Sequence, residues 1–233
     1  MSHELRILTD PDAVASAGAR FVAHAARQAA AAHGTFAMAV SGGRTPWLMF
    51  ERLAGEDVPW PSVGMWQVDE RIAPEGDEDR SLTHLLVSLP ERARGVLRPM
   101  PVDDDELETA SAAYGAALPP AFDLVHLGLG DDGHTASLVP GDPALDVRDR
   151  DVALTGEYRG RRRMTLTYRV LDRSVQVLWL VTGSDKAEPL RKLLASDPSI
   201  PAGRVAAARQ VVLADRAAAG ELRAHEDVGP GDD

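Results

Sequence analysis

Short apolar runs that end in glycine-rich turns recur along this chain, and their alternation with helix-like segments most constrains its fold. The run Phe36–Val40 ends at Ser41-Gly42-Gly43, and the run over residues 122–127 ends at Gly128-Leu129-Gly130. Apolar runs bounded in this way are typical of buried strands. Strands that alternate with helices predict an α/β fold with a mainly parallel sheet and helices on both of its faces.

The expected elements are distributed along most of the chain. The longest helix is expected at Pro11–His33, because Asp10 suits the N-cap, Pro11 the first helical position and Gly34 the stop. Further helices are expected at residues 45–53 and 82–88, from Asp104 or Asp105 to 118, and from a Ser184 N-cap to 194, with strands at 64–68, 151–155, 164–167, 175–181 and 210–213. In such a Rossmann-like arrangement, ligands bind beyond the carboxyl ends of the strands.

The length of the chain fits one domain with a sizeable core or two small domains. It has 233 residues, with no internal repeat and no linker-like segment. We therefore expect a single α/β domain over residues 1–224. Residues 225–233 are acidic and contain glycine and proline, so they are expected to form a flexible tail.

The net charge narrows the classes of partner. The chain carries 25 basic and 36 acidic residues, a formal charge of −11 at pH 7. Such a surface repels nucleic acid and anionic membranes, and an anionic ligand requires a local cationic pocket. The chain has no cysteine, which excludes disulfides, thiolate metal sites and cysteine nucleophiles.

The chain shows no targeting or membrane-spanning pattern. Residues 1–6 lack the basic segment and apolar run of a signal peptide, and no apolar stretch approaches the roughly 20 residues of a membrane span. These features predict a cytoplasmic protein with no membrane and no nucleic-acid partner. We expect a monomer or a weak homo-oligomer.

The segment Ser41-Gly42-Gly43-Arg44 follows a predicted strand and precedes a predicted helix. Its two glycines let the backbone approach a ligand, and free N–H groups at the helix start attract an anion. The spacing and the Lys-Ser/Thr ending of a Walker A loop are absent. An ordinary strand-to-helix turn explains the segment equally well.

The run from Gly128 to Gly133 matches the dinucleotide-binding pattern G-x-G-x-x-G by letter. Asp131 and Asp132 would stand where a pyrophosphate must approach, and residues 137–143 look like a loop rather than a long helix. We therefore reject dinucleotide binding for this segment.

His134 is the sharpest candidate for catalysis. It follows Asp132 and Gly133 at the end of a predicted strand, and an imidazole suits general-base chemistry near neutral pH. Asp132 is placed to orient the ring. A surface loop histidine is the alternative, whereas His126, inside an apolar strand, is expected to be structural. No histidines have metal-ligand spacing, so no metal site is predicted.

Two further loops place cations at strand ends. In Asp69-Glu70-Arg71, the arginine can hold a phosphate with two hydrogen bonds, although a surface ion-pair cluster is the simpler reading. In Ser184-Asp185-Lys186, a lysine near a helix start meets the helix dipole unfavourably, and an anionic ligand would relieve this conflict. A solvated lysine is the alternative.

These loops, in this order, resemble the 6-phosphogluconolactonase family. The resemblance covers most of the chain between residues 36 and 194, and the stretch around His134 is its most specific part. The matching segments are residues 39–46, 67–71, 122–125, 128–138, 140–141, 163–167 and 181–187.

The resemblance implies hydrolysis of 6-phospho-D-glucono-1,5-lactone in the oxidative pentose phosphate pathway, with no metal and no organic cofactor. Carried over, His134 would activate water, and Arg71 and Lys186 would bind the phosphate near the Ser41–Gly43 loop. Arg163 would line the sugar site. The chain departs from the family pattern at Ser81 and Asp172, where Asn is common, and at Pro189, inside an expected helix.

Two other functions remain to be weighed. A glucosamine-6-phosphate deaminase/isomerase shares the expected fold, but that family carries a Glu five residues after its His, where this chain has Val139. It also usually has an aromatic residue where this chain has Arg71. A non-catalytic sugar-phosphate-sensing domain normally accompanies a DNA-binding helix-turn-helix, and the single helix expected before Phe36 is too little for one.

Overall fold

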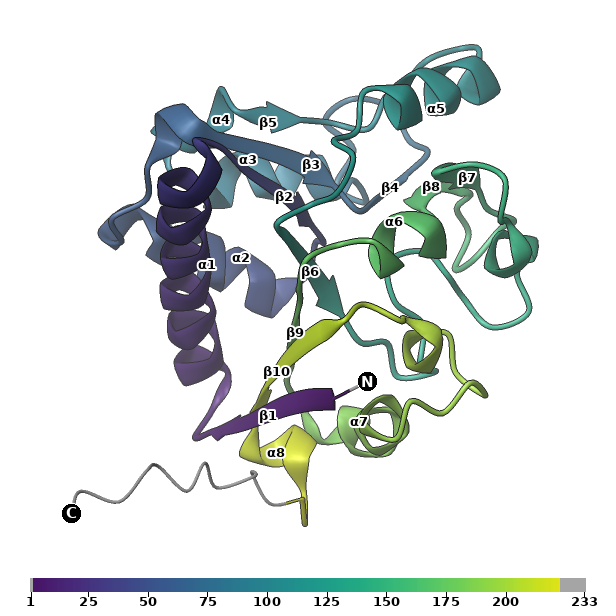
Figure 1. The fold of residues 1–233 in the computed structure, drawn as a ribbon. Helices are drawn as coiled ribbons and strands as arrows, with labels where there is room; N and C mark the ends of the chain where they lie inside the picture. The colour runs from purple at the N-terminus through teal and green to yellow at the C-terminus, as the bar shows by residue number, and fades with distance from the viewer. Residues whose placement is uncertain (1, 223–233) are drawn as a thin grey trace, which may run out of the picture.

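A seven-stranded parallel sheet forms the centre of the structure, a computed structural model that describes residues 2–222 (Figure 1). Its strands lie in the order β1-β10-β9-β6-β2-β3-β5, and every neighbouring pair is parallel. This confirms the predicted sheet. The strand bounds are β1 (Ser2–Leu8), β2 (Phe36–Val40), β3 (Val63–Gln67), β5 (Leu97–Arg98), β6 (Leu124–Gly128), β9 (Val177–Val181) and β10 (Arg209–Asp215).

Helices cover both faces of this sheet, as expected. Figure 1 shows α1 and α2 on one side and α6 and α7 on the other. The helix bounds are α1 (Pro11–His33), α2 (Arg44–Arg52), α3 (Ser81–Ser88), α4 (Glu91–Arg94), α5 (Leu107–Ala116), α6 (Tyr168–Asp172), α7 (Ala187–Leu194) and α8 (Arg216–Ala219).

Strand β9 shows how the sheet separates two apolar cores. Leu178 and Leu180 pack with α1 and α2, whereas Val177, Trp179 and Val181 pack with the helices of the other face. Successive side chains of a strand point to opposite faces, so a strand buried on both sides must be apolar throughout. All five residues of β9 are buried, which explains why this segment is a continuous apolar run.

Helix α1 begins and ends where its sequence indicates. The carboxylate of Asp10 accepts a hydrogen bond of 2.8 Å from the amide of Ala13, and Pro11 occupies the first helical position. Gly34 ends the helix with φ = 88°, a left-handed conformation that glycine adopts at little cost. The two caps define a helix of 23 residues that spans the sheet.

A second, antiparallel sheet was not expected. It has the order β4-β8-β7, with β4 at Asp69–Arg71, β8 at Arg163–Leu166 and β7 at Val152–Leu154. The strand β4 is so charged that its sequence indicated a polar loop. Glu70 is nevertheless fully buried, because its carboxylate accepts hydrogen bonds from the side chain of Gln67 and from the amides of Arg71, Ser81 and Leu82.

Two local expectations were wrong, and a third was confirmed. Helix α5 starts at Leu107 after Glu106, which makes no side-chain cap, while Asp104 accepts from the amide of Glu106 in the turn before it. Ser184 does not cap α7, because Ser184–Lys186 form a short 3-10 helix that follows Gly183. Pro189 lies inside this helix as expected. It is the third residue of α7, where the missing amide breaks no intrahelical hydrogen bond.

The order of the strands creates a switch point between β2 and β6. From β2 the chain proceeds outward to β3 and β5, and from β6 it proceeds in the opposite direction to β9 and β10. Loops that leave the carboxyl ends of two such strands diverge and leave a crevice, the usual ligand site of these folds. The glycine-rich loops after β2 and β6 both start here.

Within residues 2–222, no helix combines the length and apolar character needed to cross a membrane. A single domain over residues 1–224 stays a prediction. The predicted acidic tail, residues 225–233, lies outside the described residues.

Candidate active site

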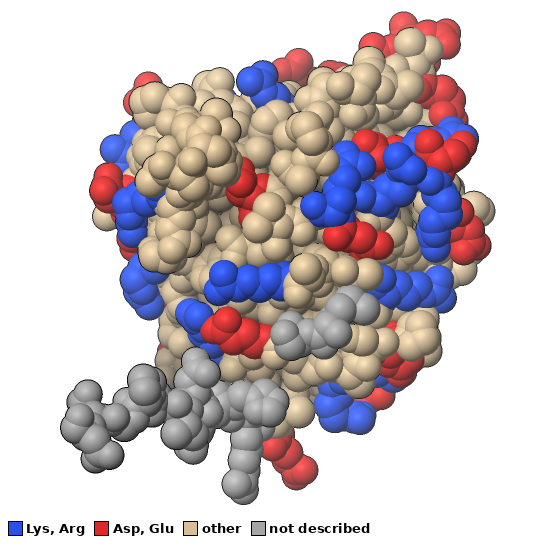
Figure 2. Space-filling model, viewed as in Figure 1, with Lys and Arg blue, Asp and Glu red and all other residues tan. Residues whose placement is uncertain are grey.

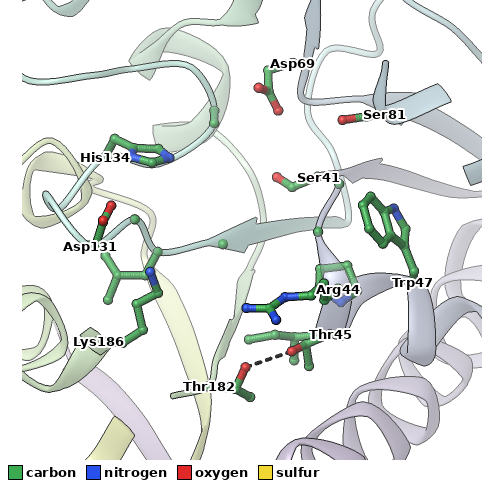
Figure 3. A pocket seen from close by; sticks show the side chains of 18 of the residues that line it. Ser41, Arg44, Thr45, Trp47, Asp69, Ser81, Asp131, His134, Thr182 and Lys186 are labelled. Carbon is green, nitrogen blue, oxygen red and sulfur yellow. Dashed lines mark hydrogen bonds between the residues drawn. The ribbon is translucent and has the colours of Figure 1, made fainter. Parts of the chain in front are cut away.

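A pocket of about 410 Å³ opens at the switch point, between the loops that follow β2, β6 and β9 (Figure 3). Its volume lies in the range of small-molecule sites, about 300–1,000 Å³. The lining includes nine of the ten predicted site residues, the exception being Asp132. These nine are Ser41, Gly42, Gly43, Arg44, Asp69, Arg71, His134, Arg163 and Lys186.

The pocket is cationic although the protein is acidic. Five basic side chains line it against two acidic ones, an excess of three positive charges in a chain of net charge −11. The basic residues are Arg44, Arg71, Arg159, Arg163 and Lys186, and the acidic ones are Asp69 and Asp131. Such a cavity concentrates anions despite the repulsive overall field.

Another basic group lies over α6 and β7, on the face shown in Figure 2. There the carboxylate of Asp151 pairs with Arg169 at 3.2 Å and with Arg173 at 2.7 Å. The single carboxylate of Asp151 offsets one of these two positive charges. The surplus of three positive charges in the pocket is larger than the surplus of one in this trio.

The Ser41–Gly43 loop leads directly into α2. Gly43 precedes the helix with φ = 135°, a backbone conformation that favours glycine, and no side chain caps the helix start. The hydroxyls of Thr45 and Thr182 lie 2.8 Å apart and join this helix start to the end of β9 (Figure 3). The uncapped start of α2 and its dipole thus face the cation-rich cavity, as an anion site requires.

His126, in β6, holds the Ser41–Gly43 loop through hydrogen bonds to Ser41. Its ring is fully buried, and this burial lowers the pKa of His126 to about 3, so the ring is neutral. Its Nδ1 accepts from the amide of Ser41 at 3.3 Å, and the Ser41 hydroxyl donates to the His126 carbonyl at 3.1 Å. These contacts agree with the structural role expected for His126.

His134 points into the cavity from the loop after β6 (Figure 3). Its Nδ1 lies 2.5 Å from Asp132 Oδ1, and its amide donates to the same oxygen at 3.0 Å. A carboxylate accepts hydrogen bonds only, so this contact places the proton on Nδ1 and leaves the lone pair on Nε2. The ring is therefore oriented as a proton acceptor.

Gly130 leaves the space that the ring of His134 occupies. A Cβ atom on residue 130 would lie 2.0 Å from Nδ1 of His134, well inside van der Waals contact. The loop thus requires glycine at this position for the observed orientation of the imidazole. Gly130, which belongs to the G-x-G-x-x-G match, is therefore explained by its contact with His134 rather than by dinucleotide binding.

A hydrogen-bonded group supports the floor of the pocket. The hydroxyl of Ser137 donates to Asp69 at 2.5 Å and accepts from Arg163 at 3.5 Å. Burial lowers the pKa of Arg163, and the neighbouring charges of Arg71 and Arg159 act in the same direction, whereas Asp69 opposes them. The guanidinium is thus held in a dry site beside two like charges.

Strand pairing sets two of these cations side by side. Arg71 in β4 is directly opposite Arg163 in β8, an arrangement that is destabilising for like charges unless an anion lies between or near them. Arg71 also donates to the Ser81 hydroxyl at 2.6 Å. Ser81, one of the departures from the family pattern, therefore orients Arg71 in this chain.

Lys186 enters the pocket from the opposite side of the view in Figure 3 to Ser81. Its ammonium lies 2.8 Å from Asp185, whose pKa is lowered first by this hydrogen bond and also by the charge of Arg44. Lys186 and Arg44 therefore share one carboxylate. The other lysine of the chain, Lys192, pairs with Glu188 on α7 and does not line the pocket.

Several residues at the site carried no recognised signal in the sequence. Arg159 lines the cavity and pairs with Asp131 at 2.9 Å, and its neighbour Tyr158 donates to Asp132 at 2.8 Å. Both lie in the hairpin between β7 and β8. The run of arginines at 159 and 161–163, next to Gly160, was the available clue to a basic hairpin turn.

One acidic group at the site has the proximity that a metal ion needs. Ligand atoms of Asp131, Asp132 and His134 lie within 4.8 Å of one another. Each of these side chains already has a partner, since Asp131 pairs with Arg159 and Asp132 with His134 and Tyr158. These contacts favour the hydrogen-bonded arrangement over a metal centre.

The fold agrees with the comparisons to known proteins. The chain belongs to the family described as glucosamine-6-phosphate isomerases/6-phosphogluconolactonase, whose model matches residues 9–214.

The relatives cover most of the chain. A 6-phosphogluconolactonase of Synechocystis sp. is 35% identical over 186 residues, which are 73% of this chain and 76% of the relative. One of Rhizobium meliloti is 36% identical over 210 residues, or 84% and 89%. The crystal structure of 6-phosphogluconolactonase from Thermotoga maritima aligns with a TM-score of 0.82 and 26% identity, covering 92% of this chain and 100% of that one.

The close approach at Gly130 yields a test of the site geometry. We expect Gly130→Ala to displace the ring of His134 and to lower turnover of a lactone substrate at least tenfold, because catalytic groups tolerate little displacement. Steady-state kinetics measure the loss. Gly55→Ala is the control, since a Cβ at residue 55 meets nothing within 4 Å. An alanine variant at 130 with full activity would contradict the proposed importance of this orientation.

Proposed function

We propose that this protein hydrolyses 6-phospho-D-glucono-1,5-lactone to 6-phospho-D-gluconate, the lactonase step of the oxidative pentose phosphate pathway. The observation that carries the proposal is the position of His134. Its ring, oriented by Asp132, faces a cavity with an excess of positive charge. The substrate combines a hydrolysable carbonyl with a phosphate, and the pocket offers a proton acceptor and cations for these two parts.

The proposed reaction needs little beyond a positioned water and a base. Nε2 of His134 takes a proton from water as the oxygen attacks the lactone carbonyl, and a tetrahedral oxyanion forms. Donors at the site stabilise this oxyanion, and the buried Arg163 is one candidate. The protonated imidazole then returns the proton to the ring oxygen as the carbon–oxygen bond breaks. A lactone is already an activated ester, so this sequence suffices.

The roles of the other candidates follow from their places around the cavity. Arg71 and Lys186 are proposed to bind the phosphate, with Arg44 and the Ser41–Gly43 loop nearby. Asp69 fixes Ser137 and, through it, Arg163. Asp132 does not line the pocket, so it is proposed to act on His134 rather than on the substrate.

The isomerase alternative lacks a carboxylate at the expected position. Ring opening in that branch of the family would need a Glu at residue 139, where this chain has Val139. Val139 is buried and does not line the cavity. Fold similarity does not separate the two activities, because one family model includes both. The site chemistry therefore favours the lactonase.

A sugar-phosphate sensor without turnover is the remaining alternative. Among the described residues that precede β2 there is one strand, β1, and one helix, α1, which do not make a helix-turn-helix. A cytoplasmic location and catalysis without a metal or organic cofactor stay predictions.

His134 offers the most direct test of the mechanism. His134→Gln keeps much of the size of the side chain but cannot accept a proton, and general-base catalysis is worth about 10²–10⁴ in rate. We expect kcat to fall by about that factor, with KM and thermal stability nearly unchanged. The wild-type rate should fall at acidic pH, because a protonated imidazole cannot act as the base.

Spontaneous lactone hydrolysis makes a control without enzyme essential in this assay, in which the lactone is generated in situ. The glutamine variant should lose the acidic limb of the pH profile. If it kept more than about a third of the wild-type kcat, His134 would not be the base. Ligand-induced stabilisation by the sugar phosphate without any turnover by the wild-type protein would favour the sensor.

Phosphate recognition is tested by comparing two substrates. Losing a charge-assisted contact costs about 1.5–3 kcal/mol, or roughly ten- to hundredfold in kcat/KM. We expect Arg71→Ala and Lys186→Ala each to lose at least tenfold on the phosphorylated lactone and little on the unphosphorylated one. Lys192→Ala is the matched control, since Lys192 lies outside the pocket. Equal losses on both substrates would remove Arg71 and Lys186 from phosphate recognition.

Chelation tests the proposal that no metal takes part. The test can fail, because the carboxylates of Asp131 and Asp132 lie close enough together to share a metal ion. Exhaustive treatment with EDTA should leave kcat unchanged, since the mechanism uses only water and a side-chain base. Lost turnover that magnesium or zinc restored would replace this mechanism by a metal-assisted one.

A further inference from the structure

The hydroxyl of Tyr158 contacts the carboxylate behind His134. It donates to Asp132 Oδ2 at 2.8 Å, while Asp132 Oδ1 accepts from His134. Neither Tyr158 nor Asp132 lines the cavity, whereas His134 does. We propose that Tyr158 is a positioning residue that holds Asp132 and, through it, the Nδ1–H tautomer of His134. The proposal rests on the lactonase function proposed above and extends the site by one residue.

Tyr158 lies at the start of a tight hairpin turn, which places it beside Asp132. The backbones of Tyr158 and Arg161 exchange hydrogen bonds of 3.0 and 3.3 Å, and the two residues between them, Arg159 and Gly160, have φ of 51° and 78°. Two positive φ values are typical of the two-residue turn that joins twisted antiparallel strands, here β7 and β8. The turn therefore sets the direction of Tyr158 relative to β8.

Ion pairs hold the hairpin against the loops on either side. Arg161 pairs with Asp77 at 3.1 Å and with Asp79 at 2.9 Å, in the segment before α3. Arg159 pairs with Asp131, in the loop that also carries His134. The hairpin is thus attached to both neighbours of the pocket, and Tyr158 lies between these attachments.

The ring of Tyr158 is held separately from its hydroxyl. It meets the ring of His134 edge to face, with centroids 5.5 Å apart and planes at 65°. The guanidinium groups of Arg159 and Arg163 each lie 5.1 Å from its centroid, within the range of a cation–π contact. A phenylalanine at residue 158 would keep these ring contacts. It would lose the hydrogen bond to Asp132 and the weaker 3.5 Å contact between the hydroxyl and Nδ1 of His134.

The hydrogen bond from Tyr158 fixes the second oxygen of the Asp132 carboxylate. The contacts of Asp132 with His134 involve only the first oxygen. Oδ1 receives both the amide and the ring N–H of His134, whereas Oδ2 receives Tyr158. The side chain of Asp132 is 32% exposed, so water competes for Oδ2. Without the hydroxyl, the carboxylate is free to rotate and to release the imidazole into its other tautomer.

The protonation states suit this arrangement. Burial raises the pKa of the Tyr158 phenol, and its hydrogen bond to Asp132 raises it further, so the phenol keeps the proton that it donates. Burial alone would raise the pKa of Asp132, but its hydrogen bonds to His134 and Tyr158, with the charge of His134, lower it overall. Asp132 therefore remains an ionised acceptor.

Kinetics of Tyr158→Phe, Asp132→Asn and the double variant test the proposal. We expect Tyr158→Phe to lower kcat about two- to tenfold, the effect of one net hydrogen bond, with KM within twofold of wild type. Asp132→Asn should lose more. In the Asp132→Asn background the change at Tyr158 should have little further effect, because the Tyr158 hydroxyl acts mainly through Asp132, to which it is closer (2.8 Å) than to Nδ1 of His134 (3.5 Å).

Tyr168→Phe is the matched control. It removes a buried tyrosine hydroxyl that donates to the Pro201 carbonyl at 2.8 Å, outside the pocket. It is expected to change stability without a change in kcat. Equal kcat losses in the two tyrosine variants, or additive losses in the double variant, would overturn the proposal.

Imidazole ¹⁵N NMR provides a readout that does not depend on turnover. The signals of His134 are assigned by their loss in His134→Gln and recorded at alkaline pH, where imidazole is neutral. We expect mainly the Nδ1–H form in the wild type and a mixture of tautomers in Tyr158→Phe. Unchanged signals would overturn the role of Tyr158, whatever the kinetics. A wild type without lactonase activity would instead refute the proposed function, and the NMR result would still decide the inference.

Discussion

The pairing of β2 with β6 is the constraint on which the rest of the site depends. Only two residue pairs join these strands, Met38 with Leu124 and Ala39 with Val125, yet the direction of the chain across the sheet reverses there. The Ser41 and His134 loops therefore leave adjacent strand ends and diverge. The flanking strands β3 and β9 then bring Asp69 and Lys186 to the same edge, so residues far apart in sequence share one cavity.

The small antiparallel sheet supplies what the parallel sheet alone lacks. It sets Arg71 against Arg163 and carries the hairpin of Tyr158 and Arg159 to the side of His134. Its first strand needs a buried carboxylate, Glu70, whose hydrogen bonds hold the start of α3 and hence Ser81. The parallel sheet provides the loops and helix starts of the site. The antiparallel sheet provides most of its guanidinium groups.

The parts of the fold that were predictable are those with a local signal. Apolar runs marked β2, β6 and β9, and the caps at Asp10 and Gly34 marked α1. The edge strand β1 was missed because it begins with three polar residues and contains no continuous apolar run, so that it is defined mainly by its pairing with β10. The strand β4 was missed because charged residues indicate a loop unless tertiary contacts satisfy them, as they do for Glu70.

The candidate site likewise contains residues that the sequence could predict and residues that it could not. Residues in the glycine-rich loops and the charged residues of the matching segments were recognisable, and nine of the ten predicted site residues line one cavity. Tyr158 and Arg159 were not, because a basic hairpin turn becomes part of a site only when another sheet carries it there. The wrong Ser184 cap has a similar cause, since the amide of Gly183 donates to Asp215 at the end of β10, a strand that is distant in sequence but adjacent to β9 in the sheet.

The contrast between the acidic protein and its cationic pocket bears on how a charged molecule arrives and stays. At physiological ionic strength the Debye length is about 8 Å, so salt screens the outer, repulsive field more than the partly buried charges of the cavity. A phosphorylated ligand crosses that repulsive region before it reaches the arginines and the lysine. Ionic strength should therefore act in opposite directions on the two kinetic steps, easing encounter while shortening the residence time of the bound anion.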